Sequence, residues 1–377
     1  MQQSLPRRSL SSLLALLIIA GCNEVTTPLA RQLGTATADY VVGEYAWTPD
    51  SRRIVFVSNG KDSRAYEVEA TGHTPHASTM SVTGSNGTNR AAQVGTQAGA
   101  YYFSVVQDRW CSPATIYQSL TMTAVDTVAT DVSNASFSAS PSGNRVAFTA
   151  VAVPPDSTLC PDFRDSLVVL DVVGPTRGRR RTIERNIGWS DGLPLSLGDD
   201  GSLVYLGTDL TDPRNGRSVV RYAPSLGSAR DVWRPASDSI VSEAVSLDVA
   251  SIGGTPHLTI ARSLLRERTA TIEDLDVITG QRTLLATLQD VGRVMAFTRS
   301  TDGRAWAAWL LVEDKGPCAL ERHCLVTRLL VNLPGASTPI DMASVDGDSY
   351  PGRMKFSPDV SWLAFIYGSS LYVKRMP

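Results

Sequence analysis

A short unit of apolar and polar positions recurs along most of the chain. Each copy has an apolar residue, a short polar turn and a second apolar run, which is the pattern of two strands joined by a tight turn. Ser, Pro, Asp and Gly suit such turns, because the hydroxyl caps the backbone, Pro presets φ and Gly accepts a positive φ. The pattern therefore predicts a series of β-hairpins. The clear copies lie at 46–56, 139–148, 197–205, 297–306 and 356–365, and two weaker ones lie at 94–103 and 247–260.

The spacing of the hairpins predicts the fold. Successive copies lie roughly 50 residues apart, which is the range of propeller repeats. Several hairpins are followed by two further strand-like segments, as at 166–171 and 181–183. Four strands in each period make one blade of a β-propeller, and we find no amphipathic helix of 12 residues or more. The sequence predicts an all-β protein, a β-propeller of seven four-stranded blades, with six blades as the alternative.

The final blade lacks one strand. It ends with a strand-like segment, Ser370–Lys374, and no fourth strand follows. An open ring would leave strand edges unpaired, which proteins avoid. We therefore expect a segment within Thr35–Val42 to supply the missing strand and close the ring. Residues 35–377 are then the propeller domain, and residues 22–34 are a tether.

One detail of the turns departs from the pattern. Ser51 and Val360 stand where the other turns favour Gly. A β-branched residue at positive φ is penalised. We therefore expect the last turn to adopt a different geometry.

The first 22 residues have the layout of a secretory signal, with a positive start (Arg7 and Arg8) and the apolar stretch Leu13–Ala20. Residues 19–22, Ile-Ala-Gly-Cys, resemble the lipobox of bacterial lipoproteins. The resemblance implies removal of residues 1–21 and lipidation of Cys22, which would anchor the chain in a membrane. The alternative is an ordinary signal peptide with a chance cysteine. In enterobacterial lipoproteins an Asp after the cysteine favours retention in the inner membrane, so with Asn23 at this position the resemblance implies a place in the cell envelope at the outer membrane. We expect the chain to face the periplasm.

Two of the turns carry a second resemblance. Thr48-Pro-Asp-Ser51 and Ser357-Pro-Asp-Val360 resemble the TolB-type (WD-like) β-propeller repeat, F-S-P-D-G-x-x-I-A-F. The resemblance covers residues 36–377. It implies a propeller that acts in the cell envelope. TolB itself has six blades and a separate amino-terminal domain, for which this chain has no room beside seven hairpins.

The cysteines agree with an exported protein. If Cys22 carries lipid, four cysteines remain, and an even number in an exported chain suggests two disulfides. Cys318 and Cys324 bracket a short polar turn, so a local bridge is the favoured pairing. Cys111 and Cys160 follow the second strands of successive hairpins, and a bridge between neighbouring blades is the expected second pair. The alternative for the first pair, a metal site with His323, lacks further ligands at usable spacing.

Composition and charge narrow the class of function. The chain has 377 residues, of which 42% are hydrophobic, and its net charge is −2. These values exclude extensive disorder and argue against a nucleic-acid partner, which would require a basic face. The exception is a local basic patch formed by Arg177, Arg179, Arg180, Arg181 and Arg185. It is interpreted as a solvated hairpin edge, with contact to an anion or an acidic partner as the functional alternative.

None of the candidate chemical motifs meets its structural requirement. Residues 188–192 fit the G-x-S-x-G pattern of hydrolase nucleophiles, but no helix follows. The spacing of His73 and His76 gives at most half a metal site, and Asp346-Gly-Asp348 falls short of a calcium loop. Asp199-Asp200-Gly201 is explained as a turn. The sequence therefore predicts no catalytic residue, no metal and no cofactor.

The function predicted from the sequence is that of a monomeric, lipid-anchored periplasmic β-propeller that serves as a protein- or ligand-binding scaffold. The sequence favours a binding function over an enzymatic one. The alternative function is a propeller lyase or hydrolase with its site in the central channel. A third possibility is a surface lipoprotein that binds carbohydrate. The scaffold function implies that the protein contacts the membrane through the lipid on Cys22 and binds a protein partner in the envelope.

Overall fold

The computed structural model of the chain consists of β-strands joined by turns, without a helix in the part that it describes. All seven predicted hairpins are present as antiparallel strand pairs. The described residues are 31–34, 42–58, 64–71, 76–81, 90–97, 100–106, 114–119, 126–151, 165–187, 193–208, 218–235, 241–246, 248–264, 266–314, 324–346, 352–367 and 370–377.

The described strands form six hydrogen-bonded sheets. The first is β2 (Val42–Trp47), β3 (Arg53–Ser58), β4 (Arg64–Glu69) and β5 (His76–Ser81). The second is β6 (Arg90–Gln97), β7 (Ala100–Val106), β8 (Ala114–Ser119), β9 (Asp126–Ala139), β10 (Arg145–Ala150), β11 (Asp165–Asp171) and β12 (Arg180–Ile187).

The other four sheets follow in chain order. The third is β13 (Leu193–Leu197), β14 (Leu203–Thr208), β15 (Ser218–Ala223) and β16 (Arg230–Trp233). The fourth is β17 (Val241–Val245), β18 (Ala250–Ile252), β19 (Thr255–Leu264), β20 (Thr269–Asp276) and β21 (Arg282–Gln289). The fifth is β22 (Arg293–Arg299), β23 (Trp306–Asp314), β24 (Cys324–Asn332) and β25 (Ile340–Asp346). The sixth is β26 (Met354–Phe356), β27 (Trp362–Tyr367), β28 (Ser370–Arg375) and β1 (Arg31–Gly34).

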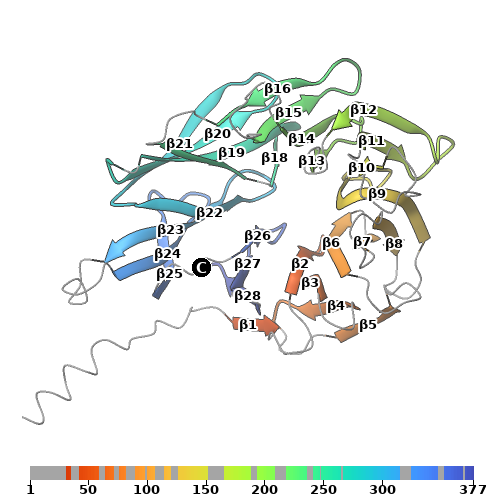
Figure 1. Cartoon of the computed structure of the whole chain (residues 1–377). Coiled ribbons are helices and arrows are strands. Elements are labelled where there is room, and N and C mark those ends of the chain that lie inside the picture. Colours follow the sequence, from red (N-terminus) through yellow and green to blue (C-terminus); the bar gives the residue numbers. More distant parts are fainter. Residues whose placement is uncertain are drawn as a thin grey trace, which may run out of the picture.

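The sheets are arranged in a ring, as Figure 1 shows, and the fold is a β-propeller. Its core lies between neighbouring sheets rather than inside a single one. Trp309 of β23, for example, packs edge-on against Phe365 of β27, with ring centroids 5.7 Å apart. Both side chains are fully buried. Such pairs add about 0.5–1.5 kcal/mol beyond the apolar area that they bury.

The count of sheets is six rather than the seven blades that the sequence favoured, because one sheet has seven strands. Its middle strand, β9, is 14 residues long. The half of β9 from Asp126 to Val132 pairs with β8. The half from Val132 to Ala139 pairs with β10. Each half of β9 therefore has one neighbouring strand, and the two halves meet at Val132.

The amino-terminal strand lies earlier than predicted. β1 pairs antiparallel with β28, with Arg31 opposite Val373 and Gly34 opposite Leu371. This places a strand in the last four residues of the expected tether. Of the segment predicted to pair here, residues 35–41 lie outside the described residues, and Val42 begins β2.

The prediction of a different geometry for the last turn is wrong. Val360 has a φ of 63°, close to the 73° of Gly303 in the equivalent turn of the preceding sheet. The Val360 N–H donates to the Ser357 carbonyl at 2.9 Å, as Gly303 donates to Ser300. The left-handed conformation costs a non-Gly residue about 1–2 kcal/mol. Val360 also packs against the apolar cluster between β23 and β27, which offsets part of this cost.

Candidate functional site

One end of the propeller carries the turns after the first and third strands of its sheets. In an antiparallel sheet of four consecutive strands, the turn after the first strand and the turn after the third lie at the same end. Hydrogen bonds join these turns from one sheet to the next. The Asp359 N–H donates to Ser51 Oγ at 3.0 Å, and the Ser142 N–H donates to Asp199 Oδ1 at 2.9 Å. We call this end of the molecule the turn rim.

The aspartates of the turn rim organise the turns. In the last turn, Ser357 Oγ donates to Asp359 Oδ1 at 2.6 Å, and the Ser361 N–H donates to the same oxygen at 3.0 Å. Burial alone would raise the pKa of Asp359, but these hydrogen bonds to the charged carboxylate outweigh burial and lower the pKa to about 2. In the first turn, a hydrogen bond from Thr48 also lowers the pKa of Asp50.

These shifts predict a fall in stability in acid. A lowered pKa in the folded state means that Asp359 stabilises the fold fully above its unfolded pKa near 4. This contribution is lost as the pH falls toward 2. Urea unfolding at pH 7, 4 and 3 should show a decreasing free energy of unfolding, and Asp359→Asn should show less of this decrease. A variant with the full pH dependence of the native chain would contradict the assignment.

The predicted basic patch is divided between structural and free arginines. Arg180 forms two bonds to the Asp131 carboxylate and lies over the Phe148 ring, 5.6 Å from its centroid. Arg181 donates to the carbonyls of Gly201 and Pro224. These two side chains therefore hold the fold together and are not available to a partner.

The other arginines of the patch are exposed. Arg177 and Arg179 lie in the turn between β11 and β12, and Arg185 lies within β12. The side chains of Arg177 and Arg179 have no hydrogen bond or ion pair to any described residue. The two turn arginines are therefore the part of the patch that a ligand on the rim could meet.

Arginine side chains connect three neighbouring turns of the rim. Arg181, in β12, reaches the Pro224 carbonyl in the β15–β16 turn at 3.3 Å. Arg230, in β16, donates to the carbonyls of Val277 and Ile278 in the β20–β21 turn. Hydrogen bonds from a charged donor contribute about 1.5–3 kcal/mol, more than neutral ones. The β11–β12, β15–β16 and β20–β21 turns are thereby held in fixed relative positions.

Each of the three connected turns exposes one large apolar side chain. Leu226, in the β15–β16 turn, is 90% exposed. Val173, in the β11–β12 turn, is 51% exposed, and Ile278, in the β20–β21 turn, is 41% exposed. Single exposed apolar residues are common, but a group of them on one face indicates an interaction surface. We call Val173, Leu226 and Ile278 the apolar turn tips.

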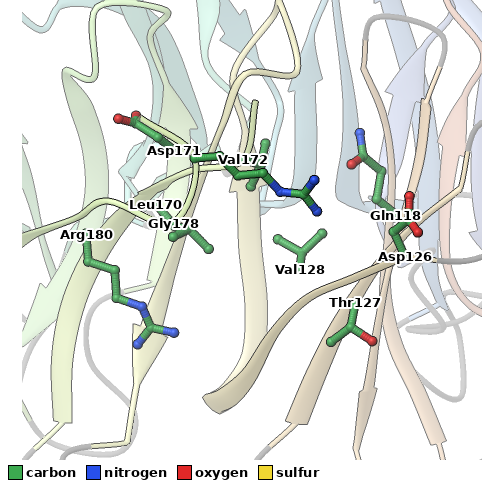
Figure 2. Close-up of a pocket in the computed structure, with 10 residues that line it drawn as sticks. Gln118, Asp126, Thr127, Val128, Leu170, Asp171, Val172, Gly178 and Arg180 are labelled. Carbon is green, nitrogen blue, oxygen red and sulfur yellow. The ribbon is translucent and has the colours of Figure 1, made fainter. Parts of the chain in front are cut away.

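A pocket of about 190 Å³ opens beside the first of these turns. Figure 2 shows the side chains of the two walls around it, Gln118 and Asp126 on one side and Asp171 and Arg180 on the other. One wall comes from β8 and the start of β9, and the other from the end of β11, the following turn and the start of β12. The lining residues are Gln118, Asp126, Thr127, Val128, Leu170, Asp171, Val172, Arg177, Gly178 and Arg180.

The chain's own contacts occupy several polar groups of the pocket. Gln118 donates through Nε2 to the Tyr102 hydroxyl at 3.0 Å, and that hydroxyl donates to the Gly143 carbonyl at 3.1 Å. Asp171 accepts from Arg145 Nε at 2.8 Å. Burial would raise the pKa of Asp171, but hydrogen bonds from Arg145 and Thr176 lower it. These contacts fix the walls of the pocket.

A series of hydrogen-bonded polar side chains, partly buried at Thr255 and His257 and buried at Asp274 and Arg299, lies near the rim between the fourth and fifth sheets. His257 Nδ1 and Asp274 Oδ2 are 2.8 Å apart, and His257 Nε2 and Thr255 Oγ1 are 2.9 Å apart. The second carboxylate oxygen of Asp274 pairs with Arg299 of β22. Although Thr, His and Asp in this order resemble a catalytic triad, Thr255 Oγ1 donates to the Ile252 carbonyl at 2.8 Å. The hydroxyl proton is thus directed away from His257. These side chains therefore act as a clamp, a set of polar contacts that joins the fourth sheet to the fifth.

A second paired cluster joins β12, β14 and β15. Tyr205, which is fully buried, donates to Glu184 at 2.6 Å, and Arg221 pairs with Glu184 at 2.6 Å. Burial and then the Glu184 carboxylate raise the pKa of the Tyr205 hydroxyl. These charges are satisfied within the cluster, so it has no group available for chemistry on a ligand.

Most of the motifs singled out in the sequence lie outside the described residues. This applies to Cys22, Cys111, Cys160 and Cys318, to His73 and His323, and to residues 188–192. Cys324 begins β24, His76 begins β5 and Asp346 ends β25, but their side chains are not described. Lipidation of Cys22 and the two disulfide pairings therefore stay predictions.

Within the described part of the chain, no three His, Cys, Asp or Glu side chains are placed to hold a metal ion. The same residues include no helix of the length and apolar character needed to cross a membrane.

The sequence matches no family model and no curated protein. Solved structures that resemble the chain have β-propeller folds at low sequence identity. The oligogalacturonate lyase of Vibrio parahaemolyticus is 12% identical over 94% of this chain and 95% of its own, with a TM-score of 0.60. An oligogalacturonate lyase in complex with manganese is 15% identical over 93% of this chain and 96% of its own, with a TM-score of 0.58.

A prolyl endopeptidase structure is 9% identical over 90% of this chain, which spans 51% of that protein, with a TM-score of 0.58. At such identities the likeness defines the fold alone. The chain is a β-propeller protein.

Sequence reasoning located the basic patch but missed the apolar turn tips and the pocket. The arginine cluster was visible as a run of one residue type. Leu226 and Asp126, in contrast, are single residues without a motif, and their meaning comes from the turns that surround them in space. An apolar residue in a segment otherwise typical of turns, such as Leu226 in Pro-Ser-Leu-Gly, was the available signal.

Proposed function

We propose that the protein is a lipid-anchored β-propeller of the cell envelope that serves as a binding scaffold, with the turn rim as its binding surface. The observation that carries this proposal is the set of apolar turn tips on three turns connected by Arg181 and Arg230. A surface that is already fixed in its bound shape loses less conformational entropy on association. Exposed apolar residues surrounded by polar ones are the usual composition of a protein-binding surface.

The apolar turn tips predict a specific loss of binding. Leu226→Ser should reduce the amount of an envelope protein cross-linked to the full-length chain in intact membranes by about tenfold or more, because hot-spot residues contribute most of the affinity. Leu284→Ser is the matched control, since Leu284 is 59% exposed but lies in β21 rather than in a turn. Equal recovery of the partner with both variants, or equal loss, would refute the rim as the binding surface.

The anchor is a separate part of the proposal. If Cys22 carries lipid, Cys22→Ala should move the chain from the membrane fraction to the soluble fraction while leaving binding through the rim intact. Arg31 pairs with Val373 close to the end of β28, so the chain enters β1 from the turn rim. The nine residues from Cys22 to Arg31 span at most about 30 Å. The anchor would hold the rim near the membrane, where a partner in the same membrane is within reach.

We also propose that the ring has seven blades, closed by β1. Support comes from the seven-stranded sheet, where Tyr102 and Ile116 of the first half pack in one buried cluster with Phe148 and Leu170 of the second half. A single sheet cannot pack its own two halves face to face, whereas two adjacent blades do so. Counting these halves separately gives seven units, six of four strands and one of five (β17–β21), and the last unit includes β1 beside β28.

The alternative, an enzyme with its site in the central channel, is favoured only by the names of the propellers that resemble this chain in fold. The described charged clusters, at Asp274 and at Glu184, lie between sheets and are paired. If the Leu226→Ser variant no longer bound a partner but still converted a substrate, this result would favour the enzyme function over the scaffold function.

A further inference from the structure

The pocket beside the β11–β12 turn holds two charges that the fold does not use. Of its four charged residues, Arg180 is paired with Asp131, and Asp171 is paired with Arg145. Arg177 and Asp126 have no side-chain partner among the described residues, and they do not pair with each other. An unpaired cation and an unpaired carboxylate thus line the same small pocket.

The two free charges come from different parts of the seven-stranded sheet. Asp126 begins β9 beside β8, and Arg177 lies in the turn after β11, on the other wall. Figure 2 shows Asp126 next to Gln118, with the Val128 side chain between the two walls. The apolar part of the lining consists of Val128, Leu170 and Val172. A ligand in the pocket would therefore meet opposite charges on the two walls and apolar side chains between them.

From this arrangement we infer that the pocket binds a small zwitterion, a free amino acid with an apolar side chain. The ligand carboxylate would accept hydrogen bonds from Arg177, whose planar guanidinium matches a carboxylate. The ligand ammonium would donate to Asp126, and the ligand side chain would lie against Val128, Leu170 and Val172. The inference rests on the proposed role of the turn rim as a binding surface.

Size and charge both support this class of ligand. A volume of about 190 Å³ lies below the roughly 300–1,000 Å³ of pockets for drug-sized ligands, so the occupant is small. The lining contains two arginines and two aspartates, so its formal charge is zero. A purely anionic ligand such as phosphate could pair with Arg177 but would bring its negative charge close to the unpaired Asp126 carboxylate, which is unfavourable.

Calorimetric titration of the full-length chain in detergent with three related ligands tests the inference. L-Leucine has both charges, L-leucinamide lacks the carboxylate and N-acetyl-L-leucine lacks the ammonium. We expect L-leucine to bind and both Arg177→Gln and Asp126→Asn to weaken it about tenfold or more. L-Leucinamide should respond to Asp126→Asn but not to Arg177→Gln, and N-acetyl-L-leucine should show the reverse.

Arg179→Gln is the matched control, because Arg179 lies in the same turn, is also exposed and does not line the pocket. All three positions are exposed, so the variants should fold as the native chain does. Failure of L-leucine to bind at millimolar concentration, an equal effect of Arg179→Gln, or tighter binding of phosphate would each overturn the inference. The scaffold proposal is tested separately by Leu226→Ser, so failure of the pocket inference and failure of the scaffold proposal give different results.

Discussion

Asp274→Asn is expected to lower the free energy of unfolding by about 3–5 kcal/mol, because it leaves the buried charge of Arg299 without its counter-ion. The Arg299 side chain is only 5% exposed. Its Nε donates to the Gly303 carbonyl at 2.8 Å, but that neutral acceptor cannot replace a carboxylate. Asp274 also holds His257 in place, so the substitution loosens both ends of the clamp between the fourth and fifth sheets.

A double-mutant cycle measures the interaction energy between Asp274 and Arg299 separately from the contacts that each makes with other residues. Arg299→Met should also be clearly destabilising, because it removes the counter-ion of the buried Asp274 carboxylate and leaves only the contact of its other oxygen with His257. The double variant Asp274→Asn, Arg299→Met should cost clearly less than the sum of the two single changes. Urea denaturation followed by tryptophan fluorescence measures all three.

Asp231→Asn is the matched control for this prediction. Asp231 pairs with Arg221 and Arg234, and its side chain is 28% exposed, so solvent screens the interaction. A loss of about 1 kcal/mol or less is expected. If Asp274→Asn were no more harmful than Asp231→Asn, the Asp274–Arg299 pair would not be a clamp of the fold.

The sequence was sufficient to predict the hairpins because their signal is local. An apolar residue, a polar turn and an apolar run within about ten residues specify two paired strands whatever lies around them. The buried side chains Phe56, Phe148, Tyr205 and Phe365 all fall in the second strands that the pattern predicted. The repeat of this unit was then enough to predict a propeller.

The same local reasoning failed where distant residues decide the outcome. The sequence predicts the strand beside β28 within Thr35–Val42, yet that strand is Arg31–Gly34. Many short segments have comparable strand character, and only pairing with β28 selects among them. The sequence predicts that Val360 avoids a positive φ, but its φ is 63°, and packing against the neighbouring apolar cluster offsets part of the cost.

The candidate site was less predictable than the fold for the same reason. Arg180 and Arg181 are indistinguishable from Arg177 and Arg179 in the sequence. Their roles differ because Asp131 and the Pro224 carbonyl, both distant along the chain, lie within reach of the first two. Which charges of a surface are free for a partner is a property of tertiary contacts, and no local pattern encodes it.

Gly303→Ala is the second large effect expected, a loss of about 2–4 kcal/mol. Gly303 has a φ of 73°, which costs a residue with a Cβ about 1–2 kcal/mol. The added Cβ would also lie 2.7 Å from Ile252 Cγ1 and 3.3 Å from Arg299 Nη2. Overpacking of this kind costs roughly a further 1–3 kcal/mol. The methyl group would therefore push the Ile252 hairpin away from the turn to which Ser251 bonds, through its N–H to the Thr301 carbonyl.

Gly280→Ala separates backbone strain from steric contact. Gly280 has a φ of 76°, and a Cβ there would have no atom within 4 Å. The two substitutions carry the same backbone cost, so the difference between their free energies of unfolding, expected to be about 1–3 kcal/mol, measures the contact with Ile252. Adding Ile252→Ala to Gly303→Ala should recover part of this difference, since it removes the atoms that the new methyl group meets. Equal losses for Gly303→Ala and Gly280→Ala would mean that the fourth and fifth sheets are not held in contact at this point of the rim.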